Sequence, residues 1–331
     1  MVGGGNERRP AADFHRVILA LQERMQTRHR TVSDDRVART VLRPFKPLLR
    51  AALRRMPHGA VRMLPAHVIN SHSYLFGLFS PRIPSFRSKL VLERTDDWNA
   101  MHLEAEDPET HGGETLDVFA RLLPHVGTVF DIGSHTGIYA IMAGVQDPSR
   151  SVYAFEPVPR IYHRLRRNIS LNRASNVQAF PYAVSEREGD IRLFVPKGQF
   201  PTEASTLPGF REPAETITVS GVTVDSFAAE HGCSPDAMKI DTEGTEDKVL
   251  RGARRCLERD RPIIICEVLR GLTEPALHTL LDPLGYSYFI ITRDGLIAKP
   301  RIEGDPTYTH LNYLMVPRDR AGQVLDALHL V

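Results

Sequence analysis

The sequence predicts an α/β fold in which helices cover both faces of a mostly parallel sheet, preceded by a basic, mainly helical extension. Two observations support this prediction. From about residue 110 onward, apolar strand-like runs alternate with runs of helical periodicity, a pattern typical of parallel sheets. Before that point the chain is strongly basic and interrupted by prolines.

Charge is divided unevenly along the 331 residues. Residues 1–89 hold 17 Lys and Arg against 5 Asp and Glu, and the remainder holds 25 against 35, although the net charge is only +2. Such an asymmetry suggests two regions with different partners. We therefore divide the chain into an extension over residues 1–95 and an α/β domain over residues 96–331.

Two amphipathic helices are expected in the extension. Apolar residues recur at helical spacing over residues 11–30, and a second helix begins at Pro47 with Arg50 and Arg54 on one side. We expect loops and short turns over residues 67–86. The basic helices could present a solvated face, dock on an anionic membrane surface, or bind an anionic substrate or RNA. Composition does not separate these roles.

The α/β domain begins with a strand at residues 127–133 and a helix at 135–146. The strands that follow are expected at residues 151–157, 177–185, 237–241, 262–268, 286–291 and 312–317, and the helices at 159–172, 246–257 and 274–285. Residues 186–224 interrupt the alternation with short β-like runs. The insertion over residues 186–220 is a candidate acceptor loop or lid, or an ordinary surface hairpin.

Cysteine content and hydropathy indicate the compartment. The three cysteines form no CxxC pair, which favours a reducing environment. The chain has no apolar run as long as the roughly 18 residues that a membrane-spanning helix needs. We expect a cytoplasmic protein, with peripheral membrane contact through the basic helices as a variant. Oligomeric state is not predicted.

The loop after the first strand has features of a nucleotide site. Asp131 ends the strand, and Gly133 and Gly137 follow in a GxxxG spacing. A dehydrogenase would carry GxGxxG and a P-loop GxxxxGK, and neither is present. Glycines let the backbone approach a ligand closely, and the acid suits a ligand with positive charge. This loop alone is a weak signal.

Glu156 ends the next strand, 25 residues later. A carboxylate there can accept hydrogen bonds from both hydroxyls of a ribose. The alternative interpretation of Glu156 is a surface glutamate before the turn-forming Pro157, and we rank it below ribose binding. Together Asp131 and Glu156 describe a nucleoside that carries a cation, and we predict S-adenosylmethionine.

The segments FDIGSHTG, YAFEP, YAVSE, VDSF, MKIDTEGTEDKVLRGA and IICEV, in this order, resemble the FkbM-type methyltransferases. The resemblance covers roughly residues 105–316. It implies a class I, Rossmann-like methyltransferase that uses S-adenosylmethionine to methylate hydroxyls, often on sugars or secondary-metabolite scaffolds. It implies nothing about the basic extension.

The resemblance also implies roles for individual residues. Asp131, Gly133 and Gly137 would lie at the methionine end of the cofactor, Glu156 at the ribose, and Ala183 and Val184 near the adenine. The family usually has Asn where this chain has His135 and often Ala where it has Ser134. We therefore expect Ser134 and His135 to belong to the cofactor loop, with His135 holding the turn or the cofactor's carboxylate.

We place the reaction after the strand at residues 237–241, where Asp241 and Glu243 are the candidate catalytic residues. Methyl transfer to oxygen needs alignment and removal of the hydroxyl proton, and a carboxylate can do the second. Glu246 and Asp247 lie in the first turn of a helix, where acids also stabilise the dipole. Glu267 ends the next strand, and Asp241, Glu243 and Glu267 together are a candidate Mg²⁺ site, a role we rank below metal-free catalysis.

We therefore predict an S-adenosylmethionine-dependent O-methyltransferase whose acceptor is a sugar, glycolipid or secondary-metabolite scaffold with a free hydroxyl. One alternative is an RNA or protein methyltransferase that binds through the basic extension, although we do not expect a nucleic-acid partner. Another is a noncatalytic adaptor on a cofactor-binding fold. The intact acidic strand ends argue against an adaptor.

Overall fold

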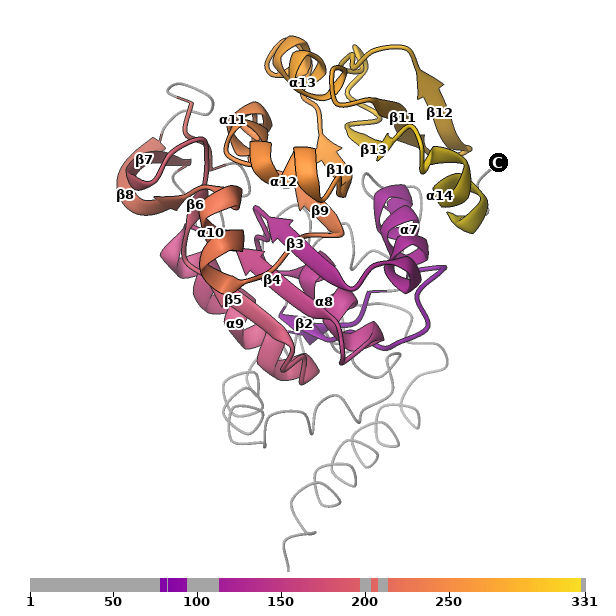
Figure 1. Cartoon of the computed structure of the whole chain (residues 1–331). Coiled ribbons are helices and arrows are strands. Elements are labelled where there is room, and N and C mark those ends of the chain that lie inside the picture. Colours follow the sequence, from indigo (N-terminus) through magenta and orange to yellow (C-terminus); the bar gives the residue numbers. More distant parts are fainter. Residues whose placement is uncertain (1–77, 82, 94–112, 197–203, 208–213, 329–331) are drawn as a thin grey trace, which may run out of the picture.

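The computed structural model describes residues 78–81, 83–93, 113–196, 204–207 and 214–328 (Figure 1). The helices expected at residues 11–30 and from Pro47 lie outside the described residues, and so does most of the 67–86 segment. The extension over residues 1–95 therefore stays a prediction. Within the described part, every helix is too short or too polar to cross a bilayer.

An eight-stranded sheet forms the centre of the fold, in the order β12-β11-β13-β10-β9-β3-β4-β5. Its strands are β3 (Thr128–Ile132), β4 (Ser151–Phe155), β5 (Val177–Phe180), β9 (Ala237–Ile240), β10 (Ile263–Glu267), β11 (Tyr286–Thr292), β12 (Gly295–Lys299) and β13 (Asn312–Pro317). The first five strands pair in parallel, whereas β13, β11 and β12 add antiparallel edges. The predicted Rossmann-like, mostly parallel sheet is confirmed.

Helices cover both faces of this sheet because side chains along each strand alternate between two apolar cores. Val129 and Val152 belong to the core on one face, and Phe130 and Tyr153 to the core on the other. The first face carries α7 (Gly113–Leu122), the short helix η3 (Leu123–His125), α8 (Ile138–Gln146), α9 (Pro159–Asn172) and α14 (Ala321–Leu328). The second carries α10 (Val224–His231), α11 (Glu246–Arg251), α12 (Arg254–Arg259) and α13 (Glu274–Leu281).

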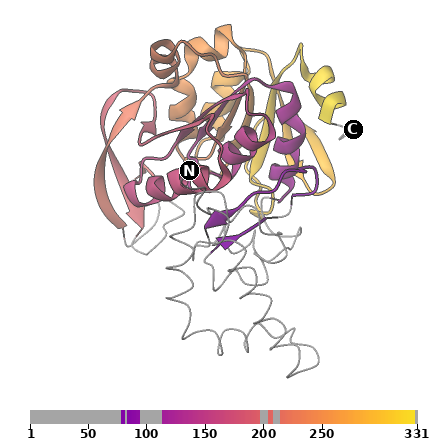
Figure 2. The same ribbon diagram turned by 90° about the horizontal axis from the view of Figure 1, so that it is seen from below.

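Two elements differ from the sequence prediction. The strand expected at 177–185 is split, because its second half, β6 (Ala183–Val184), joins β7 (Gly189–Pro196) and β8 (Ala214–Val222) in a separate three-stranded sheet. Figure 2 shows this sheet at one edge of the domain, away from β11 to β13. The helix expected at 246–257 breaks at Gly252, where a Cβ would lie 2.1 Å from the Ser185 carbonyl oxygen. Helices α7, α10 and α14 and the strand β12 were not predicted.

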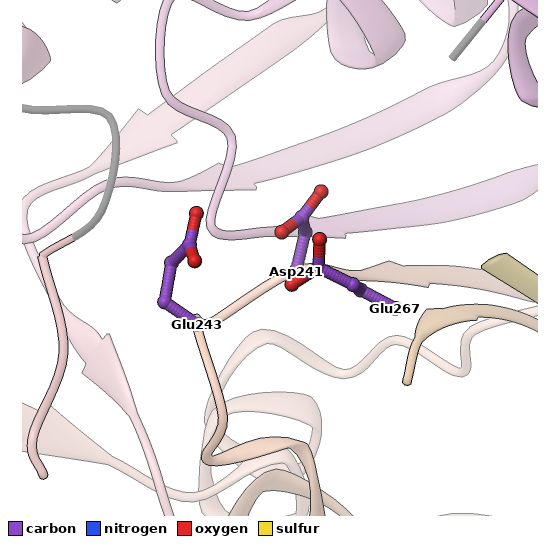
Figure 3. A group of neighbouring side chains, drawn as sticks. All are labelled: Asp241, Glu243 and Glu267. Atoms are coloured by element: carbon purple, nitrogen blue, oxygen red, sulfur yellow. The ribbon is translucent and has the colours of Figure 1, made fainter. Parts of the chain in front are cut away.

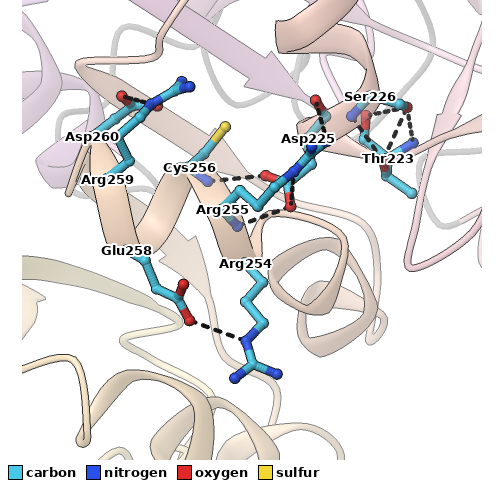
Figure 4. Close-up of polar contacts among 9 residues, drawn as sticks. All are labelled: Thr223, Asp225, Ser226, Arg254, Arg255, Cys256, Glu258, Arg259 and Asp260. Atoms are coloured by element: carbon cyan, nitrogen blue, oxygen red, sulfur yellow. Dashed lines mark hydrogen bonds and ion pairs between the residues drawn. The ribbon is translucent and has the colours of Figure 1, made fainter.

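Asp225 holds the broken helix in place (Figure 4). Its carboxylate accepts hydrogen bonds from the backbone N–H groups of Arg255 and Cys256 in the first turn of α12, both at 2.9 Å. Thr223 and Ser226 form a reciprocal capping box at the start of α10. The VDSF segment therefore joins α10 to α12.

A two-stranded element, β1 (Leu78–Phe79) with β2 (Leu92–Glu93), precedes the domain, so part of the segment expected to be loops is strand. Polar side chains of α9 anchor the chain beside it. Asn172 accepts a hydrogen bond from the N–H of Val91 at 2.8 Å and donates one to its carbonyl at 2.6 Å. Asn168 accepts one from the N–H of Glu93. Residues 90–93 are thereby packed on the α/β domain.

Candidate active site

The loop after β3 follows a path that two of its glycines make possible. Gly133 has φ +79°, and a Cβ there would lie 1.8 Å from the carbonyl oxygen of Asp241. Gly137 has φ +91°, and a Cβ there would lie 2.3 Å from Leu165. Both backbones adopt the left-handed conformation that favours glycine. The GxxxG spacing therefore brings the loop after β3 against the turn after β9.

Asp131 lies beneath this loop and is 1% exposed. Its carboxylate accepts a hydrogen bond from the N–H of Ala140 in the first turn of α8, at 3.0 Å. Burial raises the pKa of Asp131 to about 6, although the charge of Lys239 opposes the rise. Ser134 donates a hydrogen bond to the Asp131 carbonyl at 2.6 Å. Both residues shape the loop from below.

Glu156 ties the same loop to the next strand. One carboxylate oxygen accepts a hydrogen bond from the N–H of Val158 at 2.8 Å, and the other from the N–H of His135 at 3.0 Å. Burial raises the pKa of Glu156 to about 7, against the lowering effect of these two hydrogen bonds. His135 has φ +48°, so its backbone turns at the point where it meets Glu156.

A pocket opens between the loops that follow β3, β4, β5 and β9. Seven of the ten predicted site residues line it: Gly133, His135, Glu156, Ala183, Val184, Asp241 and Glu243. The other three, Asp131, Ser134 and Gly137, are not on its wall. They lie in or under the loop that forms the wall. Sequence reasoning did not identify Tyr182, Leu193 and Thr206, which also line the pocket.

Three carboxylates meet at one side of this pocket (Figure 3). Each acid has one carboxylate oxygen that lies within 4.8 Å of such an oxygen in the other two, and the acids are Asp241, Glu243 and Glu267. Asp241 and Glu267 come from the ends of neighbouring parallel strands, β9 and β10, and the register of the two strands sets them side by side. The strand ends thus bring together the three acids that the sequence suggested.

Lys239 is the cation of this cluster, and it was not among the residues predicted from the sequence. Its side chain is 1% exposed, and its Nζ lies 2.9 Å from Oδ2 of Asp241, whose side chain is 34% exposed. The Nζ also lies 5.3 Å from the centre of the Tyr139 ring. Burial opposes the charge of Lys239, but Asp241 and Tyr139 outweigh it and raise the pKa of the ammonium. Asp241 is therefore held by a buried, charged partner.

Glu246 has a structural role in the turn after Asp241. It is fully buried, and its Oε1 accepts hydrogen bonds from the N–H of Thr242 at 3.0 Å and of Gly244 at 3.1 Å. Glu243 sits between these two donors with φ +56°. Its carbonyl accepts a hydrogen bond from the Ser205 hydroxyl at 2.7 Å. The insertion between β7 and β8 therefore contacts the turn that carries Glu243.

Glu267 is the most perturbed acid of the cluster. Burial raises its pKa well above the ordinary value, and the nearby charges of Asp241, Glu243 and Glu246 raise it further. A carboxyl in such surroundings favours its protonated form, which can donate as well as accept a hydrogen bond. The carboxyls of the cluster thus have unequal surroundings: Glu267 is buried among acids, whereas Asp241 has Lys239 beside it.

Comparisons with known proteins agree with this architecture. Residues 131–288 match the model of a family described as the methyltransferase FkbM domain. The methyltransferase sdnD of Sordaria araneosa is 27% identical over 203 residues, which cover 52% of this chain and 77% of that protein. The 31-O-demethyl-FK506 methyltransferase FkbM of Streptomyces tacrolimicus is 27% identical over 157 residues, covering 38% of this chain and 58% of that protein.

The hexuronic acid methyltransferase AglP of Haloferax volcanii is 32% identical over 157 residues, which cover 46% of this chain and 61% of that protein. The matches to FkbM and AglP therefore span less than two thirds of those proteins. The matched region, residues 131–288, is slightly less than half of the chain; it begins at Asp131 and contains β9 and β10 with their acids, so this part of the chain is similar to the FkbM family of methyltransferases.

Proposed function

We propose that this protein is an S-adenosylmethionine-dependent O-methyltransferase whose acceptor is a hydroxyl of a sugar, glycolipid or secondary-metabolite scaffold. The observation that carries the proposal is the position of Asp241. Its carboxylate lies on the wall of the same pocket as Glu156, partly exposed, and is held by Lys239. A base for the acceptor and an acid for a ribose thus face one cavity.

The residues of the pocket suit S-adenosylmethionine. Glu156 is a buried acceptor for ribose hydroxyls, and Ala183 and Val184 offer an apolar wall for an adenine. The acids around the pocket favour a ligand with positive charge. When bound, this cofactor supplies an electrophilic methyl group on a sulfonium. The chain's own residues have to bind, orient and deprotonate the acceptor.

Asp241 is the proposed base, with Glu243 as the group that orients the acceptor hydroxyl. S-adenosylmethionine, held at Glu156, Ala183 and Val184, would supply the methyl group and leave as S-adenosylhomocysteine, and the hydroxyl proton of the acceptor would pass to the Asp241 carboxylate. Lys239 keeps that carboxylate oriented through its 2.9 Å contact. General base catalysis of this kind contributes roughly 10²–10⁴-fold to rate.

The test compares Asp241→Asn with the parent chain. Extracts of cells lacking the gene are incubated with the protein and S-adenosylmethionine, and mass spectrometry finds the product that has gained one methyl group. We expect turnover to fall by about 10²–10⁴-fold while cofactor affinity, measured by calorimetry, changes little. Full turnover by Asp241→Asn would show that another group removes the proton.

A divalent cation is the competing role for the same carboxylates. Mg²⁺ prefers carboxylate oxygens, and Asp241, Glu243 and Glu267 are close enough to share one ion. We favour the metal-free mechanism, because Lys239 already gives Asp241 a cationic partner. Turnover in the presence of EDTA should therefore equal turnover in Mg²⁺, and activity that disappears with EDTA and returns with Mg²⁺ would establish the metal.

A further inference from the structure

Polar side chains continue beyond Asp241, on the side away from the ribose acid. Glu267 at the end of β10 lies opposite Asn312 at the start of β13 in the antiparallel register. His310 comes just before β13, and its Nδ1 lies 3.8 Å from Oε1 of Glu114 in the first turn of α7. We call Glu114, Glu267, His310 and Asn312 the polar wall.

Each member of the polar wall has a buried polar atom that lacks a hydrogen-bond partner among the described residues: Glu114 Oε2, Glu267 Oε2, His310 Nδ1 and Asn312 Oδ1. Buried polar groups in native proteins are almost always paired, and an unpaired one is costly. Four such atoms contributed by three neighbouring elements point to a ligand that supplies the missing partners.

The polar wall lies next to the proposed reaction centre. Glu267 has an oxygen within 4.8 Å of Asp241. Tyr139 connects α7, which carries Glu114, to the same place: the centre of its ring lies 5.1 Å from that of Phe119 in α7 and 5.3 Å from Lys239 Nζ. A ligand that fills the wall would therefore have neighbouring groups beside Asp241, where the methylated hydroxyl has to lie.

The chemistry of the wall selects among acceptors. The carboxylate of Glu114 and the amide oxygen of Asn312 need partners that donate hydrogen bonds, whereas a protonated Glu267 can donate or accept one. Hydroxyl groups can do both without charge. Each basic group of the cluster already has a carboxylate beside it, since Lys239 lies 2.9 Å from Asp241 and His310 lies 3.8 Å from Glu114. A carboxylate on the acceptor would face Glu114 and Asp241 with no free cation from the described part of the cluster, and like charges at such distances repel strongly.

We propose that the polar wall is the acceptor subsite, and that it takes a neutral acceptor with several neighbouring hydroxyls and rejects one that carries a carboxylate. The inference rests on the proposed O-methyl transfer, because it assumes that Asp241 faces the acceptor. It separates this chain from a methyltransferase of hexuronic acids such as its relative AglP.

Saturation-transfer NMR tests the proposal on the full chain bound to S-adenosylhomocysteine, in EDTA. The probes are the methyl glycosides of glucose, galactose and mannose, each paired with the matching methyl uronoside. We expect the best neutral glycoside to bind more tightly than its uronoside by on the order of tenfold or more. Asn312→Ala should weaken binding of the neutral glycoside by about tenfold.

Glu114→Gln keeps the shape of the polar wall and removes one charge. It should therefore reduce the ratio between the affinity for the neutral glycoside and the affinity for its uronoside. Glu230→Gln, which removes an exposed charge on α10, is the matched control and should leave the preference unchanged. Circular dichroism establishes that each variant is folded. A second readout, inhibition of methylation by each glycoside, should follow the same order.

Equal or tighter binding of uronosides, no binding of any glycoside, or an unaltered preference in Glu114→Gln would each overturn the subsite. None of these results would contradict the proposed O-methyl transfer. That proposal is tested separately, through cofactor binding and through the loss of turnover in Asp241→Asn. Failure of those two measurements would instead remove the proposed function.

Discussion

Glu156 provides a test of the site that needs no acceptor. The residue is 5% exposed and its carboxyl accepts two backbone hydrogen bonds, yet burial raises its pKa from 4.5 to about 7. An acid whose pKa is higher in the folded state than in the unfolded state binds its proton more tightly in the folded protein. It therefore stabilises the fold at low pH, and this contribution is lost as the pH rises from about 4.5 through 7.

The size of the effect follows from the displacement. A pKa of 4.5 in the unfolded state and of about 7 in the folded state corresponds to a contribution of about 3 kcal/mol to the free energy of unfolding. About 2.5 kcal/mol of this is lost between pH 5 and pH 8, because titration in the unfolded state begins near pH 4.5. For a domain of this size, 1 kcal/mol shifts the melting temperature by roughly 2–4 °C, so Glu156 alone should account for a decrease of about 5–10 °C over that range. Asp131, with a pKa raised to about 6, adds a decrease of the same sign.

Glu156→Gln isolates this contribution. The amide is neutral at every pH, so the melting temperature of the variant should lack the part of the pH dependence that Glu156 causes in the parent. It should also pay a constant cost of about 1 kcal/mol, because only one of the two backbone N–H groups keeps an acceptor. The variant is therefore expected to be less stable than the parent at pH 5 and equal to or more stable than it at pH 8.

Thermal unfolding followed by circular dichroism from pH 5 to pH 8 measures both curves, with Glu188→Gln as an exposed control. S-adenosylhomocysteine supplies ribose hydroxyls to the ionised carboxylate, so it should raise the melting temperature of the parent more than that of Glu156→Gln. Parallel curves for the two proteins, with equal stabilisation by the ligand, would refute both the burial argument and the ribose assignment.

Three further substitutions test the fold around the site. Gly133→Ala should abolish cofactor binding and destabilise the protein more than Gly189→Ala, because both glycines have positive φ but only Gly133 has a backbone oxygen within 1.8 Å of the new Cβ. Lys239→Met should lower stability by about 1–3 kcal/mol in denaturant titration, and Lys239→Arg by less, since the half-buried Asp241 and the buried Asp131 lose the charge of Lys239. Asn172→Leu should cost about 2–5 kcal/mol in the same titration, because the N–H and carbonyl of the buried Val91 lose their partners.

The sequence predicted the parts of the site that are local. Asp131, Glu156, Asp241 and Glu267 each follow directly on an apolar run, and the ends of parallel strands meet at one edge of a sheet. Lys239 was also within reach of such reasoning. A lone charge inside the apolar run AMKI points to the same face as Asp241, two residues later, and pairing between them could have been expected.

Contacts between distant segments were not accessible in that way. Glu114 and His310 belong to α7 and to the approach to β13, and no spacing rule relates them. Asn172 looks like a surface residue in a helix of arginines, whereas it is buried and holds the chain beside β2. The split of the 177–185 run at Pro181 depends on a three-stranded sheet whose other members come later in the chain.

The contact between Gly133 and Asp241 links the two halves of the site. The loop that would hold the cofactor is pressed against the carbonyl of the residue that would accept the acceptor's proton. A change at Gly133 must therefore disturb donor and acceptor binding together, whereas Glu156→Gln should impair the donor alone and Asp241→Asn the reaction alone. If Gly133→Ala kept normal acceptor affinity while losing the cofactor, the two loops would be independent, and the shared pocket could not be what aligns the reactants.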